Sequence, residues 1–348
     1  MERELSPAGF VFAALLLMLC ILGVCVVAPQ NDYYRWQELN SGTTRKADWI
    51  YERLHFDAEP IDVALIGTSR TGGGLSGPDI EAAYCKATGR RIRVANLSIP
   101  ETGRNIHYVI AKESMKTKTP ALTVVELNET EARRQHRGFI VLADVEDVLR
   151  APILTNINYF PDLARLPGRQ AIVYFNTLAR RGAVRPEFDP RAYPGRDVDR
   201  TRELPLLDGK VISRFVAAPQ DELDAAHARR MNKLSGILHL PAPLRRLEYA
   251  TPRFYLAKIE ALAERRGGAV EYAFLPAWRE PRMPARLLDD LGVDRSIIDL
   301  GGRIANDPGK WLDATHANAW GAAELTARLA DEIVRRHPML GEEGCPKV

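Results

Sequence analysis

The chain has 348 residues, of which 46% are hydrophobic and 27% charged, a composition typical of a globular protein with a substantial core. Lys and Arg total 48 against 45 for Asp and Glu, so the charge does not indicate a nucleic-acid partner. Four cysteines without a Cys-x-x-Cys pair exclude a disulfide framework and a cysteine-rich metal module.

The N-terminal segment carries no charged residue from Ala8 to Pro29. About 20 apolar residues cross a bilayer as a helix, so residues 1–30 are predicted to form a transmembrane anchor. A cleaved signal peptide is the alternative, because Ala28 is a small residue of the kind that precedes a cleavage site. We expect a single-pass protein of the inner or cytoplasmic membrane with its main domain extracytoplasmic, although Arg3 alone says little about orientation.

Residues 31–58 are predicted to be a juxtamembrane segment between the anchor and the first strand. Short, continuously apolar runs then recur, which suits parallel strands covered on both faces. They lie at residues 61–67, 91–97, 121–127, 270–275 and 296–300. Helical patterns alternate with them at residues 78–86, 105–115, 252–266 and 319–337. This alternation predicts an α/β domain with a doubly wound parallel sheet, in which sites form beyond the carboxyl ends of the strands.

The predicted core is divided into two parts, residues 59–130 and 252–340. Between them, residues 131–251 are rich in Arg and Pro and contain helical patterns such as 220–234, but no clear strand. We therefore predict a largely helical insertion, which could shape a substrate site as a lid or serve as a structural cap.

Three polar residues could carry chemistry at the edge of this sheet. The first strand runs into Ser69, whose hydroxyl can project into the crevice at the carboxyl edge. Near the other end, Asp313 and His316 lie three residues apart just before a helix, so one loop can carry both. There His316 would take the serine proton while Asp313 orients the imidazole. The structural alternative is a turn serine, a capping aspartate and a packed histidine.

The order of four sequence blocks carries a resemblance to a known family. They are Gly67-Thr68-Ser69, Asn96-Leu97-Ser98, Val125-Glu126-Leu127-Asn128 and Asp313-x-x-His316. Together they resemble the blocks of the SGNH/GDSL hydrolase superfamily, and most closely its membrane-anchored branch with alginate O-acetylation proteins and the D-alanyl-lipoteichoic-acid transfer protein. The resemblance covers roughly residues 61–127 and 270–337. It implies a flavodoxin-like sheet.

The resemblance also implies roles for individual residues. Ser69 would be the nucleophile, with His316 and Asp313 completing a catalytic triad. The oxyanion hole would combine the Ser69 N–H, a second-block N–H from Glu101 or Gly103, and the Asn128 side chain, with Thr130 as the alternative donor. Such donors stabilise developing charge by several kcal/mol. The chain departs from the pattern because Thr68 replaces an Asp, Glu101 a Gly, and Asn128-Glu129-Thr130 the usual Gly-x-Asn-Asp.

The function implied is that of a serine-dependent acyl-ester hydrolase or O-acyltransferase, acting on acetyl groups of an extracytoplasmic polysaccharide or glycan. It needs no cofactor or metal, and a membrane-bound acyltransferase could be its partner. The alternative is a non-catalytic scaffold of a cell-envelope polysaccharide modification machinery.

Two other patterns point elsewhere. Gly72-x-Gly74-x-x-Gly77 matches a bare dinucleotide-binding pattern, but the strand ends five residues earlier at Gly67, and Asn96 stands where a ribose-binding acid would lie. A Gly-rich segment beside the nucleophile that admits a bulky acyl or glycan substrate explains it more simply. Cys85 and Cys345 could form a single bridge or stay unpaired.

Overall fold

The protein is described here by a computed structural model that covers residues 6–38, 44, 46–128, 132–133, 135–180, 187–189, 199–205, 210–293 and 296–345. Its centre is a five-stranded, all-parallel sheet with the strand order β3-β1-β4-β7-β8. The strands are β1 (Val63–Ile66), β3 (Val94–Asn96), β4 (Leu122–Glu126), β7 (Ala269–Phe274) and β8 (Ile298–Asp299). In chain order this is 2-1-3-4-5, one of the common doubly wound orders, so the predicted α/β parallel sheet is confirmed.

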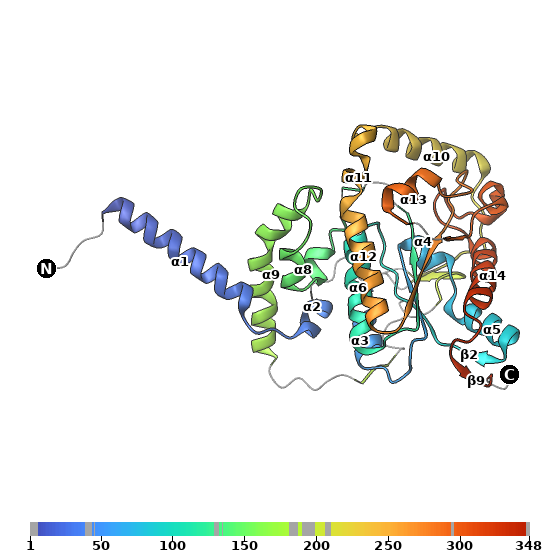
Figure 1. Ribbon diagram of the computed structural model, residues 1–348, viewed down its shortest axis with the longest axis horizontal. Helices are drawn as coiled ribbons and strands as arrows, with labels where there is room; N and C mark the ends of the chain where they lie inside the picture. The colour runs from blue at the N-terminus through green and yellow to red at the C-terminus, as the bar shows by residue number, and fades with distance from the viewer. Residues whose placement is uncertain are drawn as a thin grey trace.

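Helices cover both faces of the sheet, as Figure 1 shows. On one face α6 (Arg104–Thr117) packs against α12 (Ala250–Arg265), and on the other α5 (Gly77–Thr88) packs against α14 (Ala319–Arg336). Each of the four predicted helical patterns therefore forms a helix. A separate buried apolar cluster fills each side, which accounts for strands that are apolar without alternation.

Local sequence sets the ends of these helices. Ser76 caps α5 by accepting a hydrogen bond from the Asp79 N–H at 3.2 Å, and Asn318 caps α14 by accepting one from the Gly321 N–H at 3.0 Å. Helix α5 ends at Gly89, whose φ of 71° is left-handed and suits glycine.

Residues 31–58 form two helices that pack on the domain, α2 (Asp32–Glu38) and α3 (Ala47–His55). The indole of Trp36 and the side chain of Ile50 are fully buried, and both belong to the apolar cluster on the α6 and α12 face. The segment predicted to be juxtamembrane thus contributes to the core of the α/β domain.

The insertion contains five helices and one hairpin among its described residues. The helices are α7 (Phe139–Leu142), α8 (Val145–Leu149), α9 (Tyr159–Ala179), α10 (Gln220–Ser235) and α11 (Arg245–Glu248). The expectation of no strand was wrong, since β5 (Glu203–Pro205) pairs antiparallel with β6 (Val211–Ser213). Val211 and Ile212 are both exposed, so this short hairpin lacks the one-sided burial that makes a strand pattern recognisable.

The remaining elements are short. They are β2 (Arg90–Arg91), α4 (Ser69–Gly74), a 3₁₀ turn (Ala242–Leu244), α13 (Ala285–Leu291), two 3₁₀ turns (Arg303–Asn306 and Pro308–Lys310) and β9 (Glu342–Glu343).

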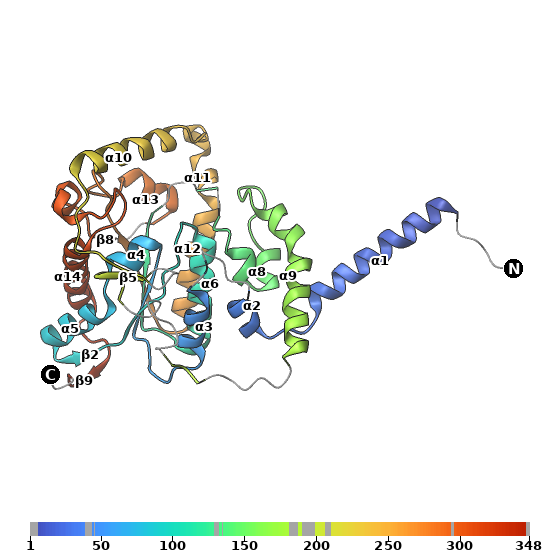
Figure 2. The ribbon, with the colours of Figure 1, turned by 180° about the vertical axis from the view of Figure 1, so that it is seen from behind.

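The first helix, α1 (Pro7–Val27), projects away from the rest of the chain (Figure 1 and Figure 2). Over the described residues it is the one helix long and apolar enough to span a membrane, and no part of its most apolar stretch is buried. Its C-terminal end lies against α9, where the Gln170 side chain donates a hydrogen bond to the Val26 carbonyl at 3.2 Å.

Cys85 and Cys345 form a disulfide, with their Cα atoms 5.8 Å apart, which decides a question that the sequence leaves open. The bridge joins α5 to the C-terminal segment beside the antiparallel pair of β2 and β9. Cys20 and Cys25, both in α1, are free.

We expect the bridge to be detectable chemically. In denaturant without reductant, a maleimide should label Cys20 and Cys25 but neither Cys85 nor Cys345. Cys85→Ser should lower the free energy of unfolding by about 2 kcal/mol, because the bridge restricts the unfolded chain. Cys20→Ser is the matched control and should change the melting temperature little. Labelling of Cys85 before reduction would contradict the bridge.

Candidate active site

Ser69 lies at the turn between β1 and α4, where it is the first residue of the helix. The turn is tight, because a Cβ at Gly67 would collide with Thr71 Oγ1 and the Glu126 side chain. Thr68 caps α4 by accepting a hydrogen bond from the Arg70 N–H at 3.1 Å. The Ser69 side chain is partly exposed at the carboxyl edge of the sheet.

The structure brings the three predicted catalytic side chains together. Ser69 Oγ lies 2.8 Å from His316 Nε2, although 247 residues separate them. On the other side of the ring, His316 Nδ1 lies 2.8 Å from Asp313 Oδ2 and 3.0 Å from Asp313 Oδ1. A proton on Nδ1 that donates to Asp313 leaves Nε2 free to accept the Ser69 proton, the arrangement that activates a serine in hydrolases. We call these three residues the triad.

Asp313 is held in place by its own loop. Its Oδ1 accepts hydrogen bonds from the Thr315 N–H at 2.7 Å and from the His316 N–H at 2.9 Å. The Asp313 side chain is about half exposed, so partial loss of hydration opposes its ionisation only in part, and hydrogen bonds from His316 and Thr315 keep the pKa of Asp313 well below its ordinary value. Trp311, fully buried, fixes the start of the loop by donating from its indole to the Ile304 carbonyl. Asp313 thus remains a carboxylate at neutral pH.

Glu126 is a buried residue beneath the nucleophile turn that the sequence did not single out as functional. Its carboxyl group accepts hydrogen bonds from the Thr68 N–H at 2.7 Å and from Thr71 Oγ1 at 2.6 Å, and it also bonds Thr68 Oγ1. Glu126 is 1% exposed and stands at the end of β4. One carboxyl group therefore links the third block to both sides of Ser69.

Arg214 is a second residue that the sequence did not indicate. It follows β6 of the hairpin, and its guanidinium donates to the Ala317 carbonyl in the triad loop. The same guanidinium lies against Gly73 of α4, where any Cβ would collide with it. Burial lowers the pKa of Arg214, and the Asp313 carboxylate opposes that shift. The insertion thus braces the helix of Ser69 against the loop of His316.

The predicted oxyanion residues of the second and third blocks contact groups outside the triad. The Asn128 amide donates a long hydrogen bond of 3.5 Å to Glu126 Oε1, so it lies beside the carboxyl group under the turn. Glu101 has a left-handed φ of 71°, and its side chain pairs with Arg137. Gly103 precedes α6 with a φ of 155°. Within the described part of the chain, none of the three hydrogen-bonds to Ser69 or His316, and Thr130 lies outside the described residues.

The glycines of the dinucleotide-like pattern serve close packing. Gly72 lies against the Ser98 hydroxyl, and Gly77 against the backbone carbonyl of Val94. Side chains at these positions would collide with, or press on, the edge strand β3 and the loop that follows it. The pattern therefore has a structural explanation in the contact of α4 and α5 with β3.

A polar cavity of about 760 Å³ borders the loop of Glu101 and Thr102. The rest of its lining comes from the insertion, including Arg137, Arg165 and Lys233, with Asp162 and Asn158 among the polar groups. Burial raises the pKa of Asp162 to about 6. The insertion therefore supplies a polar surface next to the predicted second-block donor.

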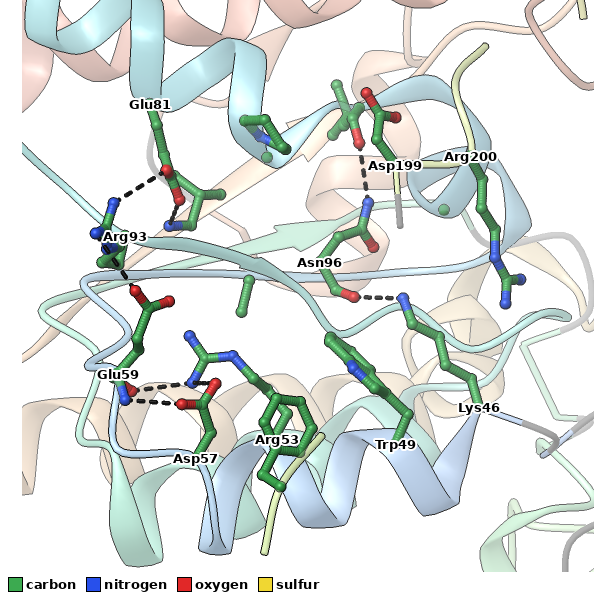
Figure 3. Close-up of a pocket in the computed structure, with 17 residues that line it drawn as sticks. Lys46, Trp49, Arg53, Asp57, Glu59, Glu81, Arg93, Asn96, Asp199 and Arg200 are labelled. Carbon is green, nitrogen blue, oxygen red and sulfur yellow. Dashed lines mark hydrogen bonds and ion pairs between the residues drawn. The ribbon is translucent and has the colours of Figure 1, made fainter. Parts of the chain in front are cut away.

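Another cavity, of about 290 Å³, lies at the edge of the sheet beside β3, and no triad residue lines it. Figure 3 shows some of its charged residues paired, with Arg93 lying 3.4 Å from Glu59 and 3.5 Å from Glu81. The Asn96 amide donates to the Leu75 carbonyl and Lys46 donates to the Asn96 carbonyl. These contacts stabilise the strand edge.

Among the described residues, no group of three or more His, Cys, Asp or Glu side chains is placed to hold a metal ion. In comparisons with known proteins, no family model matches this chain, and no curated protein matches its sequence significantly.

Proposed function

We propose that this chain is a membrane-anchored, serine-dependent acyl-ester enzyme of the SGNH type, with a flavodoxin-like core. The observation that carries the proposal is the continuous line of hydrogen bonds from Ser69 Oγ through the His316 ring to Asp313. The parallel sheet, with Ser69 after its first strand and the Asp313 loop before its last helix, is consistent with it.

The chemistry follows from the donors and acceptors of the triad. Ser69 Oγ attacks the carbonyl carbon of an acyl ester while His316 Nε2 takes its proton. The imidazolium is stabilised by Asp313, and it gives the proton to the departing alcohol, which leaves an acyl-serine. Water then resolves the intermediate in an esterase, or a sugar hydroxyl in an O-acyltransferase. The Ser69 N–H, an N–H of Glu101 or Gly103, and Asn128 are the proposed oxyanion donors.

The surroundings favour a polar substrate. Ser69 is partly exposed at the carboxyl edge of the sheet, and the cavity of about 760 Å³ at the Glu101 loop, which no triad residue lines, carries charged and amide side chains of the insertion. Hydroxyl-rich ligands need such donors and acceptors. This supports an acetylated glycan or polysaccharide as the substrate.

Two observations support an extracytoplasmic site behind a membrane anchor. Helix α1 is long and apolar enough to span a bilayer. The Cys85–Cys345 disulfide suits an oxidising compartment, where such bonds persist. We infer a single pass through the inner or cytoplasmic membrane, with the α/β domain outside and a membrane-bound acyltransferase as a candidate partner.

The test is turnover of an activated acetyl ester by the full-length protein in detergent. Ser69→Ala should abolish turnover above the uncatalysed rate, because it removes the hydroxyl that forms the acyl intermediate. Ser235→Ala, at an exposed serine of α10, is the matched control that should leave turnover largely intact. Adding an oligosaccharide and detecting an acetylated product by mass spectrometry separates a transferase from an esterase. Equal turnover by the protein and Ser69→Ala would overturn the proposal.

One observation favours the second candidate, a non-catalytic scaffold. The Asn128 amide contacts Glu126 and does not hydrogen-bond to the triad in the described structure. A scaffold would show no Ser69-dependent turnover and yet melt at the same temperature with and without the Ser69 hydroxyl.

Arg214 should act as a positioning residue. Arg214→Ala removes the brace between Gly73 and the Ala317 carbonyl, so we expect kcat to fall by about 10- to 100-fold with little change in KM for a small ester. Arg202→Ala, just before the hairpin, is the control, because the Arg202 side chain forms an exposed ion pair with Asp79 at 2.9 Å. If Arg214→Ala changed KM and kcat together, or changed neither, Arg214 would not act by holding the helix of Ser69 against the loop of His316.

A further inference from the structure

Helix α9 exposes large apolar side chains and buries several polar ones. Its buried face carries the polar Asp162, Arg169 and Gln170 beside the apolar Tyr159, Leu166 and Val173. Its outward face carries Phe160, Ile172 and Phe175, which are 68%, 52% and 65% exposed. Helices on a soluble domain normally bury the apolar face and expose the polar one.

The outward face is apolar along the whole helix. Its exposed positions follow helical spacing and include one charged residue, Arg165, among otherwise uncharged side chains. They are Phe160, Pro161, Ala164, Arg165, Gly168, Ile172, Phe175 and Ala179, of which Pro161 and Arg165 also border the cavity of about 760 Å³. Water is a poor solvent for such a face, so it requires an apolar neighbour.

Two of the buried polar side chains of α9, Arg169 and Gln170, find hydrogen-bond partners within the protein. The Arg169 guanidinium donates to the Ile140 carbonyl at 2.9 Å and to the Ala143 carbonyl at 2.6 Å. Gln170 bonds both Arg169 and the Val26 carbonyl. The inward face of α9 therefore makes specific contacts within the protein, and the apolar outward face has no neighbour among the described residues that explains it.

The position of α1 identifies the neighbour. Helix α1 meets α9 at the Val26 and Gln170 contact, and the Asn31 N–H donates to Thr177 Oγ1 at 3.1 Å. Figure 1 and Figure 2 show α9 between α1 and the α/β domain, with α1 extending on the side away from that domain. The outward face of α9 is turned to the same side, since its inward face packs on the protein. A bilayer crossed by α1 would thus reach the outward face of α9.

We propose that the outward face of α9 lies in the interfacial layer of the lipid bilayer, as a second membrane contact beside α1. An interfacial helix inserts its apolar side chains, here Ile172 and Phe175, among the headgroups and acyl chains. Two contacts fix the tilt of the α/β domain, whereas a single helix leaves it free to swing. The inference rests on the proposed anchoring role of α1.

Spin labels on the full-length protein test this. Cys20→Ser and Cys25→Ser give a background for single labels at Ile172→Cys on α9, Leu16→Cys in α1 and Met231→Cys on α10, the last an exposed control in the insertion. The protein is placed in vesicles of phosphatidylethanolamine and phosphatidylglycerol. Collisions with oxygen report lipid, and collisions with a water-soluble nickel chelate report water.

At Ile172→Cys and Leu16→Cys we expect the collision rate with oxygen to exceed that with the nickel chelate severalfold. At Met231→Cys we expect collisions with the nickel chelate to be the more frequent. Nickel dominating at Ile172→Cys while Leu16→Cys remains in lipid would overturn this inference alone. A label at Ile172→Cys that neither reagent reaches would mean that a protein surface covers α9, which also overturns it. Nickel dominating at Leu16→Cys would show that the proposed anchor itself fails.

Discussion

Replacing His316 with Ala should lower kcat for an activated acetyl ester by about a thousandfold, because the Ser69 hydroxyl then has no base within reach. His316 Nε2 lies 2.8 Å from Ser69 Oγ. The substitution should leave the fold intact, since the His316 ring is partly exposed and the loop retains its Trp311 anchor. The measurement is kcat and KM for the variant and the unaltered chain.

The double variant sharpens this prediction. If Ser69 and His316 act as one unit, then Ser69→Ala combined with His316→Ala should be no slower than either single variant. His239→Gln is the matched histidine control, because His239 contacts Glu248 in the insertion and is remote in sequence from the triad. Losses that multiply in the double variant would mean that the two residues act independently.

Glu126→Ala should lower the free energy of unfolding by about 3 kcal/mol, because it leaves buried donors unpaired beneath the nucleophile turn. The Thr68 N–H and Thr71 Oγ1 would both lose their acceptor. Arg70 is buried, which lowers its pKa, and the nearby Glu126 carboxylate counteracts that shift. Glu126→Ala would therefore also remove a charge that stabilises the buried Arg70 guanidinium. Thermal melting in detergent and ester turnover should fall together.

Two variants separate the hydrogen bonds of Glu126 from its volume. Glu126→Gln keeps the size of the side chain and one acceptor oxygen, but it places an amide N–H against the Thr68 and Thr71 donors. We therefore expect its free energy of unfolding to lie between those of the unaltered chain and Glu126→Ala. Glu271→Gln is the control for the loss of a carboxylate, since Glu271 pairs with Arg336 at 2.8 Å away from the nucleophile turn. A melting temperature unchanged in Glu126→Ala would show that the carboxyl group does not hold the turn.

The sheet and the meeting of the triad follow from local sequence. Strands buried on both faces are apolar without interruption, and the helices between them carry their own caps at Ser76 and Asn318. Once Ser69 ends the first strand and Asp313 precedes the last helix, a parallel sheet brings both to its carboxyl edge. No long-range contact has to be known for this step.

The residues that support the triad could not be predicted in the same way. Glu126 ends an apolar strand, where a polar residue is usually a solvent-facing terminus, and its burial depends on the turn that it supports. Arg214 belongs to an exposed hairpin, and its contact with Gly73 joins two segments through the tertiary fold alone. The exposed apolar side chains of α9 are recognisable only once the structure shows which of its faces is buried.

The most direct measurement is covalent capture of Ser69. A fluorophosphonate forms a stable adduct with a serine that an adjacent histidine activates. Peptide mass spectrometry of the treated full-length protein should show the adduct at Ser69, and His316→Ala should lose it. An unmodified Ser69 in the unaltered protein, or equal modification in His316→Ala, would contradict the account.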